Sequence, residues 1–154
     1  MTAFLATPVS TSGIILLAED NSNDALVVGL GFRIAGITDE LVVVRSEEEF
    51  VRFVKAEGVL SDSEYAIPRL ILLDLEMSQL DCLAVLKWLR EQPLWSCVPI
   101  IALTSSPYLR ELTRAYQLGA NSFLTKPGDL SQFVAKISQM ADSWLRVGAA
   151  ERAH

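Results

Sequence analysis

Five short apolar segments alternate with longer stretches of helical periodicity, and no other feature of the chain limits the possible folds so strongly. The apolar segments are IILLA (14–18), LVVV (41–44), LILLD (70–74), VPIIALT (98–104) and NSFLT (121–125). Apolar runs of this length are typical of strands that are covered on both faces in a parallel sheet. The segments at 14–18, 70–74 and 98–104 fit that description best, so we expect them to form the central strands.

The stretches between these segments predict five helices. Their expected limits are about 23–35, a start at Ser46, 81–91, Pro107 to about Gly119, and 129–145. Ser46 followed by Glu49 is a capping-box pattern, and Pro93 lies just beyond the end of the third helix. The polar, proline-terminated stretch 59–68 is predicted to be a loop. The last helix carries its apolar residues on one face, namely Leu130, Phe133, Val134, Ile137, Met140, Ala141, Trp144 and Leu145.

Strands and helices that alternate in this way predict one α/β domain. Right-handed crossovers place such units in a doubly wound parallel sheet of five strands, written (βα)5. The length of 154 residues is typical of one domain, and 51% hydrophobic residues are enough for a substantial core. We expect the domain to span 13–146, with loose tails at 1–12 and 147–154.

The charge and the rare residue types argue against several classes of function. A net charge of −6 argues against a nucleic-acid partner bound through its phosphates. The only histidine is His154, which argues against histidine-ligated metals, a Ser-His-Asp triad and a phosphohistidine on this chain. Cys82 and Cys97 have no metal-binding or redox spacing and are expected to be inert. The N-terminus lacks a basic signal-peptide region and no apolar run approaches the about 20 residues of a membrane span, so we expect a cytoplasmic protein.

Chemically active side chains follow four of the five predicted strands. In a doubly wound sheet the carboxyl ends of the strands lie along one edge, and the residues there are Glu19, Asp20, Asp74, Thr104, Ser105, Lys126 and Pro127. Three carboxylates repel one another unless a cation is bound or protons are taken up. Oxygen ligands without histidine or cysteine favour Mg²⁺ or Mn²⁺ over zinc.

A metal, an ammonium and a hydroxyl beside a carboxylate suit a phosphoryl group. The positive charges neutralise the phosphoryl oxygens, and the hydroxyl donates a hydrogen bond. Asp74 itself could be the nucleophile and form an aspartyl phosphate. Taken singly, each residue has a plainer explanation, because Asp74 could be a loop carboxylate or helix cap and a Lys-Pro pair is usually a turn.

Four motifs, in this order and spacing, resemble the receiver domain of bacterial response regulators. They are LLAEDNSND, ILLDLEMSQLD, IIALTSS and LGANSFLTKP, and the resemblance covers about 13–146. GANSFLTKP and the last helix, DLSQF followed by a tryptophan, look most like standalone regulators that are paired with phytochrome-type kinases. The resemblance implies the chemotaxis-regulator-like fold, with strand order 2-1-3-4-5.

The resemblance also implies the roles of the site residues. Asp74 would accept phosphate from a sensor histidine kinase, and Lys126 would bind that phosphate. Glu19, Asp20 and Asp74 would hold Mg²⁺ (or Mn²⁺) together with the backbone carbonyl of Glu76. The chain would then be a phosphoacceptor that catalyses only its own phosphotransfer and autodephosphorylation.

Further residues are assigned by the same resemblance. Thr104 would be the switch hydroxyl, Phe123 the switch aromatic residue, and the Lys126–Pro127 bond would be cis. The chain departs from the family at Ser78, where proline is common, and at Cys82, where glycine is common. Proline would stiffen the loop after Asp74, and glycine would permit positive φ.

Two surfaces are predicted to contact partners. Val27, Val28, Gly31, Phe32 and Ala35 are assigned to the core side of the first helix. Leu26 and Leu30 then lie on the adjoining face, where the resemblance implies docking of the kinase. The alternative is that the loop before the second strand covers both leucines. A homodimer through helix 4, strand 5 and helix 5 is a second expected contact.

Three other functions are alternatives to a phosphorylated receiver. A phosphatase with an aspartate nucleophile usually carries Asp-x-Asp on its first strand, whereas Asp74-Leu75-Glu76 follows the third. An FMN binder of similar fold needs hydroxyls and amides in its first loop, where Glu19 and Asp20 would repel phosphate. A degenerate receiver that only binds partners, without phosphorylation, is the remaining alternative.

Overall fold

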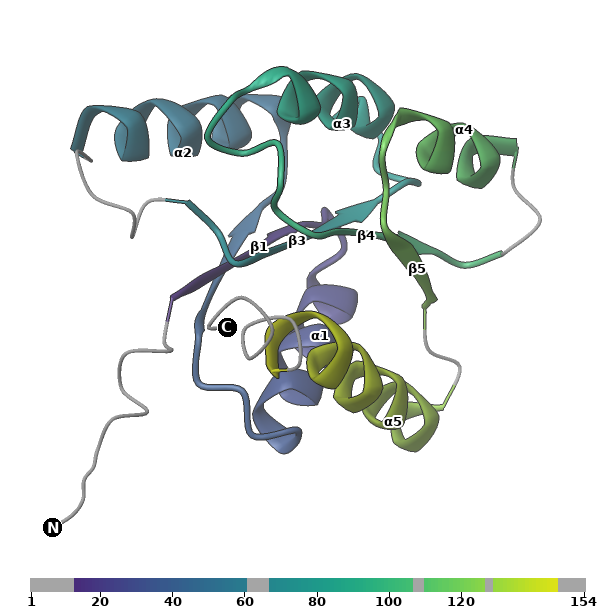
Figure 1. Ribbon diagram of the computed structural model, residues 1–154. Helices are drawn as coiled ribbons and strands as arrows, with labels where there is room; N and C mark the ends of the chain where they lie inside the picture. Colours follow the sequence, from purple (N-terminus) through teal and green to yellow (C-terminus); the bar gives the residue numbers. More distant parts are fainter. Residues whose placement is uncertain (1–12, 61–66, 107–109, 127–128, 147–154) are drawn as a thin grey trace, which may run out of the picture.

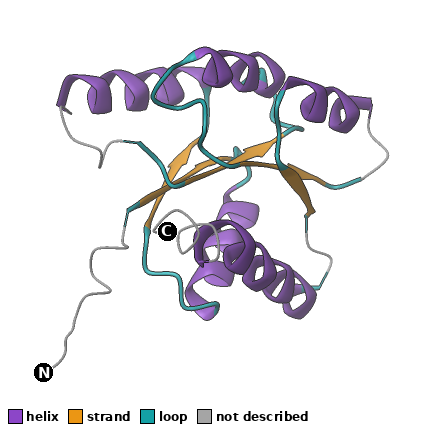
Figure 2. Ribbon diagram, viewed as in Figure 1, coloured by secondary structure: helices purple, strands orange, loops and turns teal. Residues whose placement is uncertain are grey.

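The computed structural model describes residues 13–60, 67–106, 110–126 and 129–146. Five parallel strands form one sheet in the order β2-β1-β3-β4-β5 (Figures 1 and 2). The strands are β1 (Ile14–Ala18), β2 (Glu40–Val44), β3 (Leu70–Asp74), β4 (Ile100–Thr104) and β5 (Ser122–Thr125). The predicted (βα)5 fold and strand order are therefore confirmed. The predicted tails at 1–12 and 147–154 lie outside the described residues.

Helices cover both faces of the sheet. They are α1 (Ser22–Ile34), α2 (Glu47–Leu60), α3 (Cys82–Glu91), α4 (Arg110–Leu118) and α5 (Leu130–Ala141), with a π-helical turn η3 (Asp142–Arg146) after α5. Figure 1 shows α1 and α5 on one face and α2, α3 and α4 on the other. The core is accordingly in two parts, one on each side of the sheet.

The central strands are the most deeply buried elements. All five residues of β3 and of β4 are buried, as are four of the five residues of β1. This confirms the prediction that these three strands are central. The predicted start of the fourth strand at 98 is two residues early, because Pro99 has no backbone N–H to donate to the ladder.

Side-chain caps explain where the helices begin. Asn21 accepts a hydrogen bond of 3.0 Å from the N–H of Asp24 at the start of α1. Ser46 accepts one of 3.2 Å from the N–H of Glu49 at the start of α2. The Glu49 carboxylate completes this cap on the N–H of Arg45, at 2.7 Å, and not on that of Ser46 as a standard capping box would.

The limits of the predicted loop and of the last helix can be compared with the structure. The loop expected at 59–68 is helical up to Leu60, because the first cluster of turn-forming residues starts only at Ser61. Residues 61–66 are outside the described part of the chain, as is Pro107, the expected start of the fourth helix. The last helix was predicted to run to 145, and it does so by way of the π-helical turn.

The two apolar helix faces were predicted nearly correctly. On α1, Ala25 is buried, whereas Val27 and Ala35 are only partly buried against the core. Leu130 was assigned to the core face of α5 but is exposed, and it is the first residue of the helix. Gly31 allows α1 and α5 to pack closely, since a Cβ there would lie 3.3 Å from Cγ1 of Ile137.

No helix in the described part of the chain is long and apolar enough to cross a membrane.

Candidate functional site

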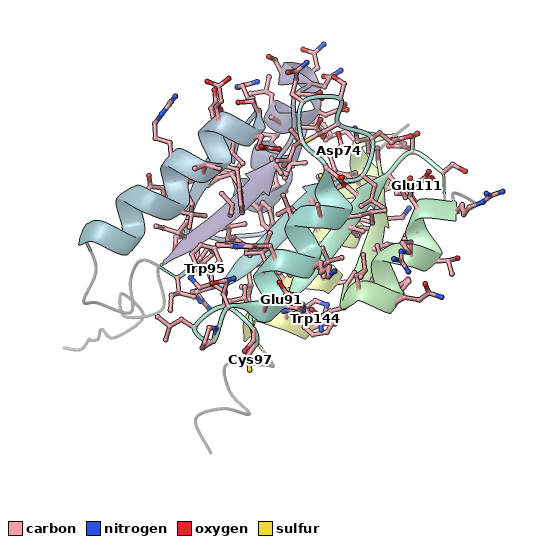
Figure 3. The ribbon with its side chains drawn as sticks, turned by 90° about the horizontal axis from the view of Figure 1, so that it is seen from above. Asp74, Glu91, Trp95, Cys97, Glu111 and Trp144 are labelled. Carbon is pink, nitrogen blue, oxygen red and sulfur yellow. The ribbon has the colours of Figure 1, made fainter. Side chains whose placement is uncertain are left out.

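The strand register brings the predicted site residues to one edge of the sheet. Asp74 pairs with Leu103, the residue before Thr104, and Thr104 pairs with Thr125, the residue before Lys126. Leu73, the residue before Asp74, pairs with Ala18 at the end of β1. Figure 3 shows Asp74 at this edge and Cys97 at the opposite one, so Cys97 is not part of the site.

Three carboxylates form the centre of the site. Glu19, Asp20 and Asp74 each offer an oxygen atom within 4.8 Å of the others. Glu19 and Asp74 are buried, at 0% and 1% exposure. A group of carboxylate oxygens at this spacing can hold a hard divalent cation such as Mg²⁺ or Mn²⁺. The structure therefore brings together the carboxylates that the sequence predicted.

Asp74 is held from two sides. Its Oδ1 accepts a hydrogen bond of 2.9 Å from the N–H of Glu76, and its Oδ2 accepts one of 2.8 Å from Nζ of Lys126. Because both oxygens have charged or backbone donors, the carboxylate is fixed at the end of β3. Such an oxygen is positioned to act as a nucleophile or as a metal ligand.

Lys126 is placed by the sheet and shared by three carboxylates. Its backbone N–H donates to the carbonyl of Thr104 at 2.7 Å. Its ammonium lies 2.8 Å from Asp74, 3.1 Å from Asp24 and 3.3 Å from Glu19. Burial by itself lowers the pKa of Lys126, but the hydrogen bonds to Asp74 and Asp24 outweigh it and raise the pKa above its ordinary value. Lys126 is therefore a cation in this site.

Glu19 is completely buried, and only one of its two carboxylate oxygens accepts a hydrogen bond in the described part of the chain. Its Oε1 accepts a hydrogen bond of 3.1 Å from the N–H of Asn21, while its buried Oε2 has no hydrogen-bond partner among the described residues. Burial, and then the nearby Asp74 carboxyl, raise the pKa of Glu19 to about 8. This Oε2 lies 3.3 Å from Nζ of Lys126 without forming a hydrogen bond to it, so the buried oxygen can still accept a cation, and the donor set suits Mg²⁺ or Mn²⁺.

Ser78 stands at the position after the methionine where the resemblance implies proline, and it makes hydrogen bonds that proline could not make. Its backbone N–H donates to Oδ2 of Asp20 at 3.3 Å, and its hydroxyl lies 3.5 Å from the same oxygen. Proline has no N–H and could not make the first of these bonds. The departure at this position therefore links the loop after β3 to Asp20.

Cys82 stands where the resemblance implies glycine, and its backbone is not strained. None of the described non-glycine residues has positive φ, so glycine is not required there. The Cys82 thiol donates to the carbonyl of Asp74 at 2.9 Å. Burial, and then the charge of Asp74, raise the pKa of this thiol to about 12, which agrees with the expectation that it is inert.

Thr104 is at the site, and its hydroxyl bonds to the backbone of Ser106. It donates to the carbonyl of Ser106 at 2.9 Å and accepts from the N–H of Ser106 at 3.2 Å. The loop is also held by Glu76, whose carboxylate accepts from the N–H of Ser105 at 2.9 Å and from its hydroxyl at 2.6 Å. Only the backbone carbonyl of Glu76 was predicted to belong to the site, and this side-chain contact was not predicted.

Phe123 lies on β5, outside the carboxylate cluster. Its side chain is partly buried, and its ring packs edge-on against Tyr116 of α4, with 6.4 Å between ring centroids. The predicted cis bond cannot be assessed, since Pro127 lies outside the described residues.

The predicted docking face on α1 is open. Leu26 is 72% exposed and Leu30 is 37% exposed, so the alternative that a loop covers both is wrong. Ile34, one turn beyond Leu30, extends the same face at 58% exposure and was not predicted to belong to it.

Asp24 is a further residue of the site that was not predicted from the sequence. It was seen only as a letter of the motif LLAEDNSND, although its ion pair with Lys126 places it in the site. Its position in the first turn of α1, four residues after Asp20, was the one available signal.

Known proteins match this chain along most of its length. Residues 15–138 match the family model described as the response regulator receiver domain. Response regulator Rcp1 of Synechocystis sp. is 29% identical over 86% of this chain and 88% of its own. The probable methanogenesis regulatory protein FilR2 of Methanothrix harundinacea is also 29% identical, over 86% of this chain and 83% of its own.

Solved structures agree with these matches. Response regulator RPA3017 in red light signaling of R. palustris superimposes with a TM-score of 0.74 at 29% identity, over 86% of this chain and 94% of that one. The Mn²⁺-bound form of Rcp1 gives 0.71 at 28% identity, over 86% and 94%. The phosphorylated cyanobacterial phytochrome response regulator RcpA gives 0.72 at 28% identity, over 87% and 94%. The resemblance to phytochrome-associated regulators is confirmed.

Proposed function

Because the chain belongs to the response regulator receiver domain family, we propose that it accepts a phosphoryl group on Asp74 from a sensor histidine kinase. One observation carries this proposal: the buried Asp74 carboxylate lies between Lys126, at 2.8 Å, and the acidic pair Glu19 and Asp20. An intact site of this kind disfavours the alternative of a degenerate receiver. The proposal assigns the exchange to the cytoplasm.

The transfer itself needs little from the protein beyond position and charge. An oxygen of Asp74 attacks phosphorus, a P–O bond forms, and the P–N bond to the kinase histidine breaks with its electron pair returning to the imidazole nitrogen. Lys126 neutralises negative charge that develops on the phosphoryl oxygens. Glu19, Asp20, Asp74 and the backbone carbonyl of Glu76 would hold Mg²⁺ or Mn²⁺, which supplies further positive charge when it is bound. Loss of the group by autodephosphorylation would use the same residues with water as acceptor.

Thr104 and Phe123 would transmit the phosphorylated state. To donate to a phosphoryl oxygen, the Thr104 hydroxyl must leave the carbonyl of Ser106, which it contacts at 2.9 Å. That step loosens the loop between β4 and α4. Phe123 and Tyr116 join β5 to α4, so movement of this loop can alter the surface formed by α4, β5 and α5. This surface is our proposed site of homodimer or target contact.

The kinase would dock on the exposed face of α1. Leu26 and Leu30 lie on α1, which begins two residues after Asp20, and exposed leucines one turn apart suit an apolar partner surface. A phytochrome-type kinase is the proposed partner, because phytochrome response regulator RcpA is among the similar structures.

A direct test is phosphorylation by a small acyl phosphate with Mg²⁺, read from the intact mass. We expect one acid-labile phosphoryl group on the wild-type chain and none on Asp74→Asn. Phosphorylation that persists in Asp74→Asn would refute the assignment of Asp74.

A further inference from the structure

Asp24 contacts the cation of the site from a different element. Its Oδ2 accepts a hydrogen bond of 3.1 Å from Nζ of Lys126, which is 102 positions away in the sequence. The same ammonium lies 2.8 Å from Oδ2 of Asp74. Lys126 is therefore divided between the proposed phosphoacceptor on β3 and a carboxylate on α1.

This ion pair is partly enclosed. The side chain of Lys126 is 16% exposed and that of Asp24 is 31% exposed. Charges in such a position are screened less by water and salt than charges on the open surface. Removal of the Asp24 charge should therefore change the electrostatic environment of the Lys126 ammonium.

We propose that Asp24 is a positioning residue that competes for the Lys126 ammonium and so limits how tightly the site retains a phosphoryl group. This inference rests on the proposed function of Asp74. It assigns to Asp24 a regulatory effect on that site, and no chemical step.

Two physical effects of Asp24 have the same sign. An ammonium has three N–H donors, and each one given to Asp24 is withheld from the phosphoryl oxygens. In addition, a phosphoryl group adds negative charge beside Glu19 and Asp20, and the Asp24 carboxylate repels it further. Replacing Asp24 by a neutral residue should therefore strengthen binding of a phosphoryl group or of its analogue.

Binding of trifluoroberyllate, a phosphoryl analogue, with Mg²⁺ at fixed fluoride concentration tests this at equilibrium. Titration calorimetry or ¹⁹F NMR gives the apparent affinity. For Asp24→Asn we expect binding about three- to tenfold tighter than wild type. Asp24→Ser is a second variant in case the first destabilises α1, and thermal unfolding identifies such a loss.

Two further variants separate the competition from a general charge effect. Glu111→Gln removes one negative charge from α4, at the same end of the molecule as Asp74 (Figure 3), from a residue that does not contact Lys126. We expect less than about a twofold change from it. In a Lys126→Met background, Asp24→Asn should lose most of its effect, because the ammonium for which Asp24 competes is absent.

The expected results support the inference, and three other results would overturn it. Unchanged or weaker binding by Asp24→Asn overturns it, and so does an equal gain from Glu111→Gln or an undiminished gain in the Lys126→Met background. In those cases wild-type binding remains, and the proposed function stands. If the wild-type chain binds neither trifluoroberyllate nor a phosphoryl group, the proposed function and this inference fall together.

Discussion

Nζ of Lys126 lies 2.8 Å from Oδ2 of Asp74, although 52 residues separate the two in the sequence. The contact depends on strand order, because β4 lies between β3 and β5 and the carbonyl of Thr104 accepts the N–H of Lys126. Any change in that order would move the ammonium away from the carboxylate.

The metal-free protein should lose stability as the pH rises. The pKa of Glu19 is raised from 4.5 to about 8, mainly by burial, whereas the unfolded chain keeps the ordinary value. Between these values the folded state binds more protons than the unfolded state, so the free energy of unfolding falls with increasing pH. Urea unfolding with a chelator at about pH 5.5 and about pH 7.5 measures this. Glu19→Gln should flatten the profile, and a wild-type profile without that fall would contradict the prediction.

Mg²⁺ should stabilise the fold by relieving repulsion among the three carboxylates. At a concentration about 100 times the dissociation constant, the expected gain is about 2.7 kcal/mol. Without metal, Asp20→Asn should raise stability by about 0.5–1 kcal/mol, because it removes one like charge. Thermal unfolding with and without millimolar Mg²⁺ is the measurement. Equal melting temperatures for the wild-type chain would rule out a metal site of useful affinity.

Thr104→Ala should separate phosphorylation from its consequences. The hydroxyl now bonds to Ser106, so its loss leaves Asp74 and Lys126 in place. We expect phosphorylation by a small acyl phosphate to continue, while any phosphate-dependent change in dimerisation or target binding disappears. Thr104→Ser is the matched control, because it keeps the hydroxyl. A normal response of Thr104→Ala in sedimentation or binding assays would reject the coupling.

The double variant Leu26→Lys with Leu30→Glu should impair only transfer from the kinase. Both side chains are exposed, at 72% and 37%, so the variant should fold. Phosphorylation by a small acyl phosphate should remain normal, whereas transfer from the cognate kinase should slow by at least about tenfold, since about 1.4 kcal/mol of lost docking energy suffices. Val51→Lys on α2, also exposed, is the matched control. Wild-type rates from both donors would leave α1 without a docking role.

Arg90→Met should destabilise the fold far from the site. The guanidinium donates five hydrogen bonds, to the carbonyls of Gly119, Ser96 and Val98 and to Oδ1 of Asn121. Methionine keeps much of the side-chain volume but supplies none of these donors, and Oδ1 of Asn121 keeps only its bond from the N–H of Ile100, so the expected cost is about 2–4 kcal/mol.

Chemical denaturation measures this loss. Lys87→Met, an exposed position on the same helix, should change stability by less than about 0.5 kcal/mol. A similar small effect of Arg90→Met would show that water replaces its hydrogen bonds.

The sheet, its central strands and the edge at which Glu19, Asp20, Asp74 and Lys126 meet could be predicted from the amino-acid sequence. This was possible because apolar runs mark buried strands and because parallel strands end at a common edge. These are properties of local pattern and of chain connectivity, and they do not depend on the direction of any one side chain.

The side-chain contacts at that edge became known only from the three-dimensional structure. The contact of Asp24 with Lys126, the N–H of Ser78 on Asp20 and the hydroxyl of Thr104 on Ser106 were not predicted. Each depends on how far a helix is rotated against the sheet or on the path of a loop. Those are set by packing between elements that are distant in sequence, and a periodic pattern of apolar residues carries no information about them.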